Sequence, residues 1–446
     1  MRRIAVVGAG QAGLQLALGL VADGCEVTLV AERTPEQVRG GRVLSTQAMF
    51  GPALRIEAAA GLDLWTDEAP SVASVDAALV APPATRVLEF TMPLDEPARS
   101  VDQRIKLARW LELLAERGGR VEYRSLDRAG LHALARRHEL TVVAAGRGEL
   151  AGIFERNAAR SPFDRPQRAL RPVEGRAGGV PFEDPGQLAA PGRDHGQLVP
   201  AGQRVQPGPV QRAVLDPAAG PRARMHALPG LGELYLQPAL TRSGPCDILL
   251  WEALPGSPLD AFGDGPEVGV QLDRIRTLLA EYLPWEAEHW RDAEPTDAGA
   301  GLWGAVTPTV RRPVAELGSG VDAVHVLGLG DAVVVNDPIT GQGANGAARA
   351  ADAYRQAIRE HGDAPFTADW MCRTAERFWQ QHARHTVEFT AAMLTMPDHL
   401  QGVFAAAAEY PAVARRLANT YAEPSDHAAW LATPELTTAY LSSIGK

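Results

Sequence analysis

The hydrophobic pattern at the beginning of the chain predicts a strand–helix–strand unit. Residues 3–7 (RIAVV) form a short apolar run that is typical of a strand buried on both faces. A glycine turn and an Ala/Leu-rich stretch follow, and this stretch predicts a helix that Gly24 ends. A second apolar run at 25–32 (CEVTLVAE) predicts another buried strand and completes a βαβ unit.

Similar patterns recur along the chain. Four later runs predict further strands: 139–146, 233–240, 246–254 and 323–330. Residues 103–117 show helical periodicity, with an apolar side made of Ile105, Leu107, Leu111 and Leu114. From about residue 366 the pattern is mainly helical. Together these elements indicate an α/β fold with a helical C-terminal region.

One segment lacks any regular period. Residues 171–220 contain nine Gly and eight Pro, 17 of 50 residues, which is well above ordinary usage. We interpret this segment as a long loop or a disordered insert.

Composition narrows the class of protein. A chain of 446 residues with 46% hydrophobic residues suggests a globular protein of two or three structural units. The net charge of −10 argues against a nucleic-acid partner, because there is no basic excess to neutralise phosphates. Cys25, Cys246 and Cys372 form no CxxC pair, so neither a disulfide framework nor a metal site is predicted. The N-terminus runs directly into a strand, and we expect a cytoplasmic protein without membrane association.

The turn after the first strand carries the motif Gly8-x-Gly10-x-x-Gly13. In this context Gly8 allows a tight turn, Gly10 lets a pyrophosphate approach the backbone, and Gly13 lets the helix pack on the strand. The free N–H groups of the helix N-terminus attract phosphate. Glu32, which closes the second strand, is placed to accept hydrogen bonds from a ribose. The motif predicts a dinucleotide site but does not separate FAD from NAD.

A second glycine-rich helix start lies near residue 340. Gly330 and Asp331 end a predicted strand, and an Ala-rich helix begins after a short loop. The loop residues of interest are Pro338, Gly341, Gln342, Gly343, Ala344 and Asn345. Such a helix N-terminus can hold the negatively charged edge of a reduced flavin ring. The alternative is an ordinary turn in which Asn345 only stabilises the helix.

The two motifs together resemble flavoprotein monooxygenases with the aromatic-hydroxylase fold. The resemblance implies that Asp331 contacts the ribityl chain of the flavin and that residues 341–345 face its ring. It also implies that Arg42 and Arg104 lie near the flavin and its pyrophosphate.

Longer stretches are similar to the oxygenase components of styrene and indole monooxygenases. They are 97–104, 142–156, SPFDRPQRAL at 161–170 and the C-terminal helical region. Ala145-Gly146 stands where single-component hydroxylases carry an Asp-Gly pair linked to NAD(P)H, which fits an enzyme that receives reduced FAD from a separate reductase. The Trp-x-Trp-x-Ile-Pro motif of flavin-dependent halogenases does not occur.

Residues expected to line the substrate pocket match the indole type of this family. They are Ser45, Gln47, Met49, Val72, Val75 and Ala98. The Gln47 amide oxygen is suited to accept the indole N–H, and Met49 to supply soft apolar contact. The alternative is that these side chains only pack beneath the flavin.

The resemblance predicts an α/β fold in which a Rossmann-like FAD-binding domain of the aromatic-hydroxylase, glutathione-reductase-like type is interleaved with a β-sheet substrate domain. The first part of the FAD-binding domain is expected at 1–170, with a pocket-forming segment at about 66–100. The atypical insert follows at 171–222 and the substrate domain at 223–300. The second part of the FAD-binding domain is expected at 301–365 and the helical region at 366–446.

The predicted activity uses reduced FAD and O₂, through a flavin C4a-hydroperoxide, to epoxidise indole or styrene-like aromatics. No side-chain base is required, because the cofactor carries the chemistry. The implied partner is an NAD(P)H:flavin reductase, and a homodimer is left open. Two alternatives remain: a single-component NAD(P)H-dependent hydroxylase, and a flavin-binding protein whose catalysis is impaired by the unusual 171–222 segment.

Overall fold

The computed structural model describes residues 1–45, 48–176, 195–196, 207–208, 221–262, 265 and 267–444. The chain divides into two compact units. Unit 1 comprises Met1–Thr66, Val101–Gln167 and Val306–Leu394, and unit 2 comprises Asp67–Ser100, Arg168–Ala305 and Thr395–Lys446. No helix in the described ranges combines the length and apolar character needed to span a bilayer.

Unit 1 is built on a six-stranded sheet with the order β16-β17-β6-β1-β2-β5. Its strands are β1 (Arg3–Val7), β2 (Glu26–Ala31), β5 (Arg120–Tyr123), β6 (Leu140–Val143), β16 (Val314–Leu317) and β17 (Val324–Gly328). All neighbours are parallel except β16 and β17. The apolar runs that predicted buried strands at 3–7, 25–32, 139–146 and 323–330 are confirmed as β1, β2, β6 and β17.

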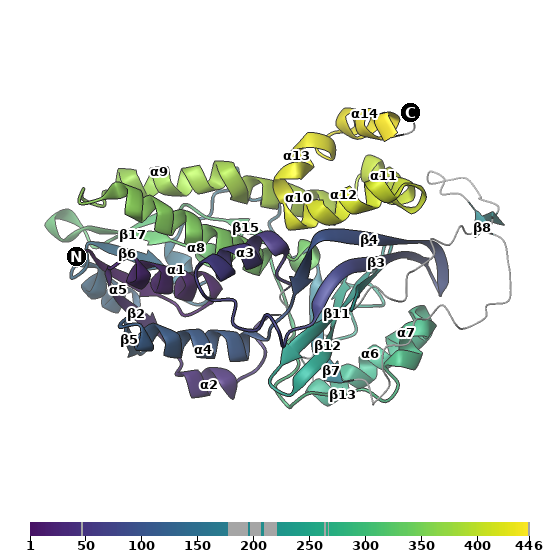
Figure 1. Ribbon diagram of the computed structural model, residues 1–446, viewed down its shortest axis with the longest axis horizontal. Coiled ribbons are helices and arrows are strands. Elements are labelled where there is room, and N and C mark those ends of the chain that lie inside the picture. Colours follow the sequence, from purple (N-terminus) through teal and green to yellow (C-terminus); the bar gives the residue numbers. More distant parts are fainter. Residues whose placement is uncertain are drawn as a thin grey trace. The chain divides into compact units, whose positions relative to one another are not determined.

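Helices cover both faces of this sheet (Figure 1). The helices with residues in these two core clusters are α1 (Gln11–Ala22), α2 (Pro35–Arg39), α4 (Gln103–Glu116), α5 (Arg128–Ala135), α8 (Gln342–His361) and α9 (Ala368–Phe378). Unit 1 also includes α3 (Gly51–Ala59) and α10 (Arg384–Thr395). Ile4 and Val6 of β1 pack in one core cluster with α1, α4, α8 and α9. Ala5 and Val7 point to the other face and pack in a cluster with α5. This alternation explains why β1 reads as a continuous apolar run.

The predicted helix ends are also observed. Gly24 follows α1 with φ +81°, the left-handed conformation that glycine adopts without strain.

The helix predicted at 103–117 is α4, but its buried side differs from the prediction. Lys106 is 2% exposed and therefore buried, whereas Ile105 is only partly buried.

Unit 2 contains an eight-stranded sheet with the path β13-β7-β12-β11-β10-β3-β4, and β14 pairs with β7. Its strands are β3 (Ser71–Ala81), β4 (Thr85–Arg99), β7 (Ala169–Arg176), β10 (Ala223–Leu228), β11 (Gly232–Thr241), β12 (Gly244–Ala253), β13 (Glu294–Pro295) and β14 (Gly304–Ala305). The strands predicted at 233–240 and 246–254 are confirmed as β11 and β12.

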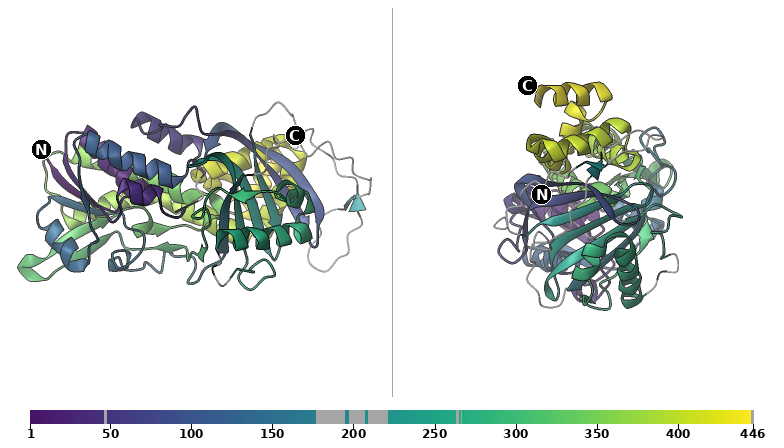
Figure 2. Two further views of the ribbon diagram at one scale, coloured as in Figure 1. Left: turned by 90° about the horizontal axis from the view of Figure 1, so that it is seen from below. Right: turned by 90° about the vertical axis from the view of Figure 1, so that its right-hand side faces the viewer.

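Helices pack on both faces of the unit 2 sheet (Figure 2). On one face, Leu234 and Trp251 pack in an apolar cluster with α6 (Val268–Tyr282) and the adjoining α7 (Pro284–His289). On the other face, Phe90 of β4 makes an edge contact with Phe404 of α11, with ring centroids 6.0 Å apart. The C-terminal helices of this unit are α11 (Asp398–Glu409), α12 (Pro411–Ala422), α13 (His427–Trp430) and α14 (Pro434–Ile444).

The interpretation of 171–222 as a loop is wrong for its first six residues. They belong to β7, which pairs with β12 in the register Val173↔Leu249. Glycine is typical of loops, but a Cβ at Gly175 would lie 2.5 Å from the ring of the fully buried Trp290. The glycine thus makes room for a core side chain. Residues 195–196 and 207–208 pair as two short strands, and Pro221 and Arg222 precede β10. The rest of the segment lies outside the described residues.

The two units also differ from the predicted domain boundaries. The segment at 66–100 was assigned to the FAD-binding domain, but β3 pairs with β10 and so joins the unit 2 sheet. The helical region predicted at 366–446 is divided, with residues up to Leu394 in unit 1. Hydrogen bonding between strands distant in sequence accounts for the first difference.

Candidate functional site

The glycines after β1 have three distinct environments. Gly8 has φ +110°, and its N–H donates to the Val30 carbonyl oxygen at 2.9 Å. A Cβ at Gly13 would overlap the Gly8 carbonyl oxygen, so only glycine lets α1 pack this closely on the turn. Gly10 is the N-cap of α1, and a Cβ there would meet no described heavy atom within 4 Å other than its chain neighbours. The backbone at Gly10 is therefore open to an incoming group.

The carboxyl ends of the central strands meet at the same edge of the sheet. Val7 at the end of β1 pairs with Val30 of β2 and with Val143 of β6. Glu32, which is exposed, follows β2 directly. Gly328 at the end of β17 pairs with Val143, so the loop that begins with Gly330 starts at this edge as well.

The second glycine-rich loop leads into α8. Gly341 is the N-cap of this helix and has φ +66°, and Pro338 begins the short 3₁₀ helix before it. The Thr340 and Thr390 hydroxyls, both buried, share a hydrogen bond of 2.7 Å that holds this loop against α10. Gly343 has open space at its Cβ position, whereas Gln342 is buried and its amide donates to the Thr340 carbonyl oxygen. Ala344 is partly buried beside this turn.

The N-termini of α1 and α8 point to the same end of unit 1. Near the start of both helices, the Gln15 amide donates to the Ala348 carbonyl oxygen at 3.3 Å. Near their other ends, Arg355 of α8 makes two bonds of 2.7 Å to the Asp23 carboxylate after α1. The helices thus run in parallel, side by side (Figure 1). Both start at a glycine that has no capping side chain, which leaves their first N–H groups for an anion.

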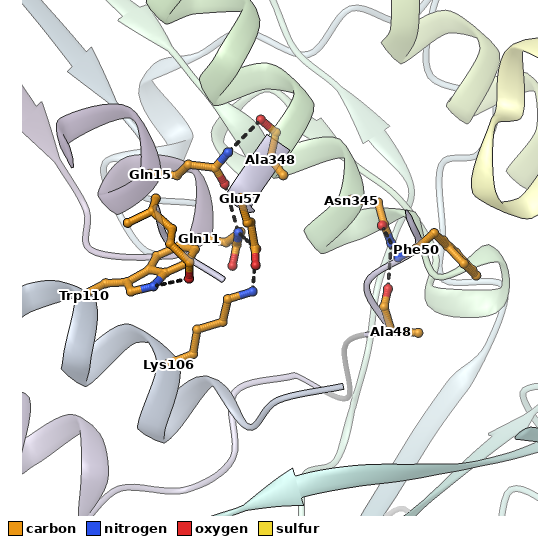
Figure 3. Close-up of polar contacts among 10 residues, drawn as sticks. Gln11, Gln15, Ala48, Phe50, Glu57, Lys106, Trp110, Asn345 and Ala348 are labelled. Atoms are coloured by element: carbon orange, nitrogen blue, oxygen red, sulfur yellow. Dashed lines mark hydrogen bonds and ion pairs between the residues drawn. The ribbon is translucent and has the colours of Figure 1, made fainter. Parts of the chain in front are cut away.

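Asn345 links this helix start to the chain before α3. Its amide nitrogen donates to the Ala48 carbonyl oxygen at 2.7 Å, and its amide oxygen accepts from the Phe50 N–H at 2.9 Å (Figure 3). The amide nitrogen also donates to the Gly341 carbonyl oxygen at 2.7 Å. The side chain is 2% exposed. Asn345 therefore fixes residues 48–50 against α8 through contacts within the protein.

Asp331 lies in the loop after β17. Burial among the surrounding protein atoms raises its pKa to about 6, and the nearby cations Arg147 and Arg311 oppose this shift. A Cβ at Gly146 would lie 2.5 Å from the Asp331 Cβ, so the Ala145-Gly146 pair after β6 sits directly against this residue.

The two predicted arginines occupy different environments. Arg104 is fully buried, with its Nε 2.7 Å from the Asp102 carboxylate, and its guanidinium also donates to the Gly41 carbonyl oxygen at 3.4 Å. Arg42 is exposed and follows Gly41. Arg104 thus supports the backbone that carries Arg42.

The residues predicted to line a substrate pocket fall in both units. In unit 1, Ser45 is half-buried, and Met49 is 1% exposed in an apolar cluster with Ala53, Leu54 and Ala348. Gln47 lies outside the described residues. In unit 2, Val72 and Ala98 are buried and directly opposite each other on β3 and β4, and the buried Val75 is opposite Met92.

Sequence reasoning missed a buried polar network beside the α1 start. Glu57 of α3, Lys106 of α4, and Gln11 and Gln15 of α1 form it (Figure 3). The available signal was the pair of glutamines, four residues apart in an otherwise apolar helix.

Structural comparison defines the class of protein. The chain resembles a flavoprotein/dehydrogenase from Cytophaga hutchinsonii with a TM-score of 0.63 and 14% identity, covering 100% of this chain and 99% of the other. It resembles a triple mutant of the flavin-dependent brominase Bmp2 with a TM-score of 0.59 and 15% identity over 100% of both chains. PqsL of P. aeruginosa, in complex with 2-aminobenzoylacetate, has a TM-score of 0.57 and 17% identity over 90% of this chain and 97% of its own. The fold is that of flavin-binding proteins of the aromatic-hydroxylase type, and the site fits a flavin.

Sequence comparison narrows this class. Residues 208–289 match the family described as "Styrene monooxygenase A putative substrate binding domain". The styrene monooxygenase StyA of Pseudomonas fluorescens is 29% identical, and StyA of a Pseudomonas species is 30% identical, each over 81% of this chain and 78% of the relative. The chain belongs to the styrene monooxygenase family and is a flavin-dependent monooxygenase.

Proposed function

We propose that this chain is the oxygenase component of a two-component system that takes reduced FAD from a separate NAD(P)H:flavin reductase. In this proposal it uses O₂ to epoxidise indole in preference to styrene. The observation that carries the proposal is the pair of parallel helices that start at Gly10 and Gly341 at one end of unit 1. One start suits the diphosphate of FAD, and the other suits the ring of the same cofactor.

The surrounding residues support binding and orientation. Glu32, which directly follows β2, would accept hydrogen bonds from the adenosine ribose, and Asp331, in the loop after β17, would accept them from the ribityl hydroxyl groups. The N-terminus of α8 stabilises negative charge on a reduced ring. When bound, the reduced flavin supplies the activation of O₂ and the oxygen transfer. The chain then has to hold the substrate and exclude water.

The indole preference rests on the residues of the expected pocket. Ser45, Gln47 and Met49 match the indole type, and Gln47 supplies an acceptor for the indole N–H, which styrene lacks. In unit 2, the other expected pocket residues, Val72, Val75 and Ala98, are apolar and lie on β3 and β4. The Asn345 side chain bonds to the backbone of Ala48 and Phe50, on both sides of Met49.

A reductase-coupled product assay tests the proposal. The purified chain is incubated with FAD, NADH, a generic flavin reductase and equal amounts of indole and styrene. We expect indigo, formed from indoxyl, to exceed styrene oxide. More styrene oxide than indigo would overturn the indole preference.

Two controls test the alternatives. Rapid reduction of FAD by NADH without the reductase would identify a single-component hydroxylase. Peroxide equal to the NADH consumed, with no oxygenated product, would identify an impaired flavin-binding protein. We expect neither, because Ala145-Gly146 replaces the Asp-Gly pair of single-component relatives and eight described strands of unit 2 form one hydrogen-bonded sheet.

A further inference from the structure

A buried ion pair lies beside the start of α1. The Lys106 Nζ is 2.5 Å from the Glu57 Oε1, and each side chain is no more than 3% exposed. The Lys106 ammonium also lies 4.9 Å from the Trp110 ring centre, over its face. Two ions removed from water in this way are costly to the fold, so their retention calls for a physical reason.

Gln11 connects this ion pair to the helix start. It is the first residue of α1, directly after Gly10, and it is 6% exposed. Its amide nitrogen donates to the Glu57 Oε1 at 2.7 Å and to the Gln15 Oε1 at 3.0 Å (Figure 3). Its own Oε1 is buried and has no hydrogen-bond donor among the described residues. Glu57 therefore holds the side chain of Gln11, the first residue of α1, in place.

The charges of Glu57 and Lys106 also act on the N-terminus of α1. A carboxylate near a helix N-terminus is attracted by the free N–H groups, and it repels any other anion that approaches them. At the start of α1, the Glu57 charge alone would oppose a diphosphate. Lys106 cancels that charge at short range, so the carboxylate can hold Gln11 without weakening the anion site.

We propose that Glu57 and Lys106 are positioning residues for the cofactor diphosphate: Glu57 fixes Gln11 at the start of α1, and Lys106 neutralises Glu57 so that the helix N-terminus keeps its affinity for an anion. This inference rests on the proposed binding of FAD. It differs from a purely structural role in one measurable respect, because the charges of the two residues have opposite effects on anion affinity.

Three variants separate the two roles: Lys106→Met, Glu57→Gln and the double variant. Oxidised FAD is titrated by fluorescence quenching, and the free energy of unfolding is measured in urea. We expect Lys106→Met to bind FAD about tenfold more weakly, since it leaves an uncompensated carboxylate near the diphosphate. Glu57→Gln should bind about threefold more tightly than the double variant, because it leaves an uncompensated ammonium.

Arg355→Met is the matched control. It breaks an ion pair between Arg355 of α8 and Asp23, which follows α1. This pair lies at the far end of α1, about 18 Å from Gly10 for a helix of twelve residues. We expect FAD affinity within about twofold of wild type, since solvent screens charges at this distance.

The outcomes are distinct. If Lys106→Met and Glu57→Gln weaken FAD binding equally and in proportion to their loss of stability, the pair is only structural and the inference is overturned. If Lys106→Met does not fold, the comparison of Glu57→Gln with the double variant decides. Tighter FAD binding by Glu57→Gln supports the inference, and equal or weaker binding overturns it. If the wild-type chain itself does not bind FAD, the proposed function fails instead.

Discussion

At the scale of the residue, the pKa of Asp331, which we propose contacts the ribityl chain, makes the stability of the flavin-free chain depend on pH. Its pKa is raised from 3.8 to about 6 because burial by the surrounding protein outweighs the attraction of Arg147 and Arg311. A raised carboxyl pKa means that the folded chain holds the proton more tightly than the unfolded chain. The resulting stability is fully present below pH 3.8 and is lost as the pH rises through about 6. Asp331 is crowded by neighbouring protein atoms but keeps a solvent-exposed surface, so solvent screening keeps the effect on stability small.

Asp331→Asn should therefore stabilise the flavin-free chain more at pH 7.5 than at pH 4.5. The amide cannot ionise, so the variant avoids the unfavourable charge that wild type acquires at the higher pH. Urea unfolding at both pH values measures this difference in midpoint. An equal change at the two pH values would show that the substitution acts through packing and not through the charge.

At the scale of the element, the start of α1 separates residues that build the fold from those that leave room for a ligand. Gly13 faces the Gly8 carbonyl oxygen, whereas the Cβ position of Gly10 is open. Gly10 also has φ −83°, which any residue adopts easily. The two glycines of one motif therefore have different reasons to be glycine.

Gly13→Ala and Gly10→Ala should fail in different ways. We expect Gly13→Ala to lower the free energy of unfolding by about 1–3 kcal/mol or more, because the methyl group overpacks the turn. Gly10→Ala should change it by no more than about 1 kcal/mol. FAD affinity should nevertheless fall at least about tenfold in Gly10→Ala, a loss of about 1.4 kcal/mol in binding. Normal FAD binding by a stable Gly10→Ala chain would place the diphosphate elsewhere.

Local signals explain which elements could be predicted from sequence. The β1–α1–β2 unit follows from apolar runs, a glycine turn and a terminating Gly24, all close in sequence. The strand β7 was missed because Pro172 and Gly175 are typical of loops, and its reason to be a strand is the distant partner β12. Lys106 was missed for the same reason: its burial depends on Glu57, which comes from another helix.

At the scale of the whole molecule, the residues expected to bind the cofactor and those of the matched substrate domain lie in different units. The glycine turns, Glu32 and Asp331 belong to unit 1, and residues 208–289 belong to unit 2. The sequence predicts this separation, but it assigns residues 66–100 and the C-terminal helices differently from the two units of the structure. The chain crosses between the units several times, and only the sheet pairing shows which segments belong together.

The buried ionic cluster of unit 2 provides a test of this division. The Glu286 carboxylate of α7 accepts from Arg224 at 2.9 and 3.0 Å and lies 2.8 Å from His226, both on β10. Burial alone would raise the pKa of Glu286, but these two partners lower it below its usual range. The carboxylate therefore remains charged and ties α7 to the sheet.

Glu286→Gln should lower the stability of unit 2 without changing the affinity of unit 1 for FAD. The substitution removes one charge of the buried Glu286–Arg224 ion pair, and a loss of this kind costs about 3–5 kcal/mol. We expect unchanged affinity for FAD, less oxygenated product for each NADH consumed and correspondingly more peroxide, because a loosened substrate domain positions the substrate poorly. Titration of FAD and product-to-NADH ratios measure the two effects in one preparation. A parallel loss of FAD affinity would show that unit 2 contributes directly to cofactor binding, and the division of roles would then be wrong.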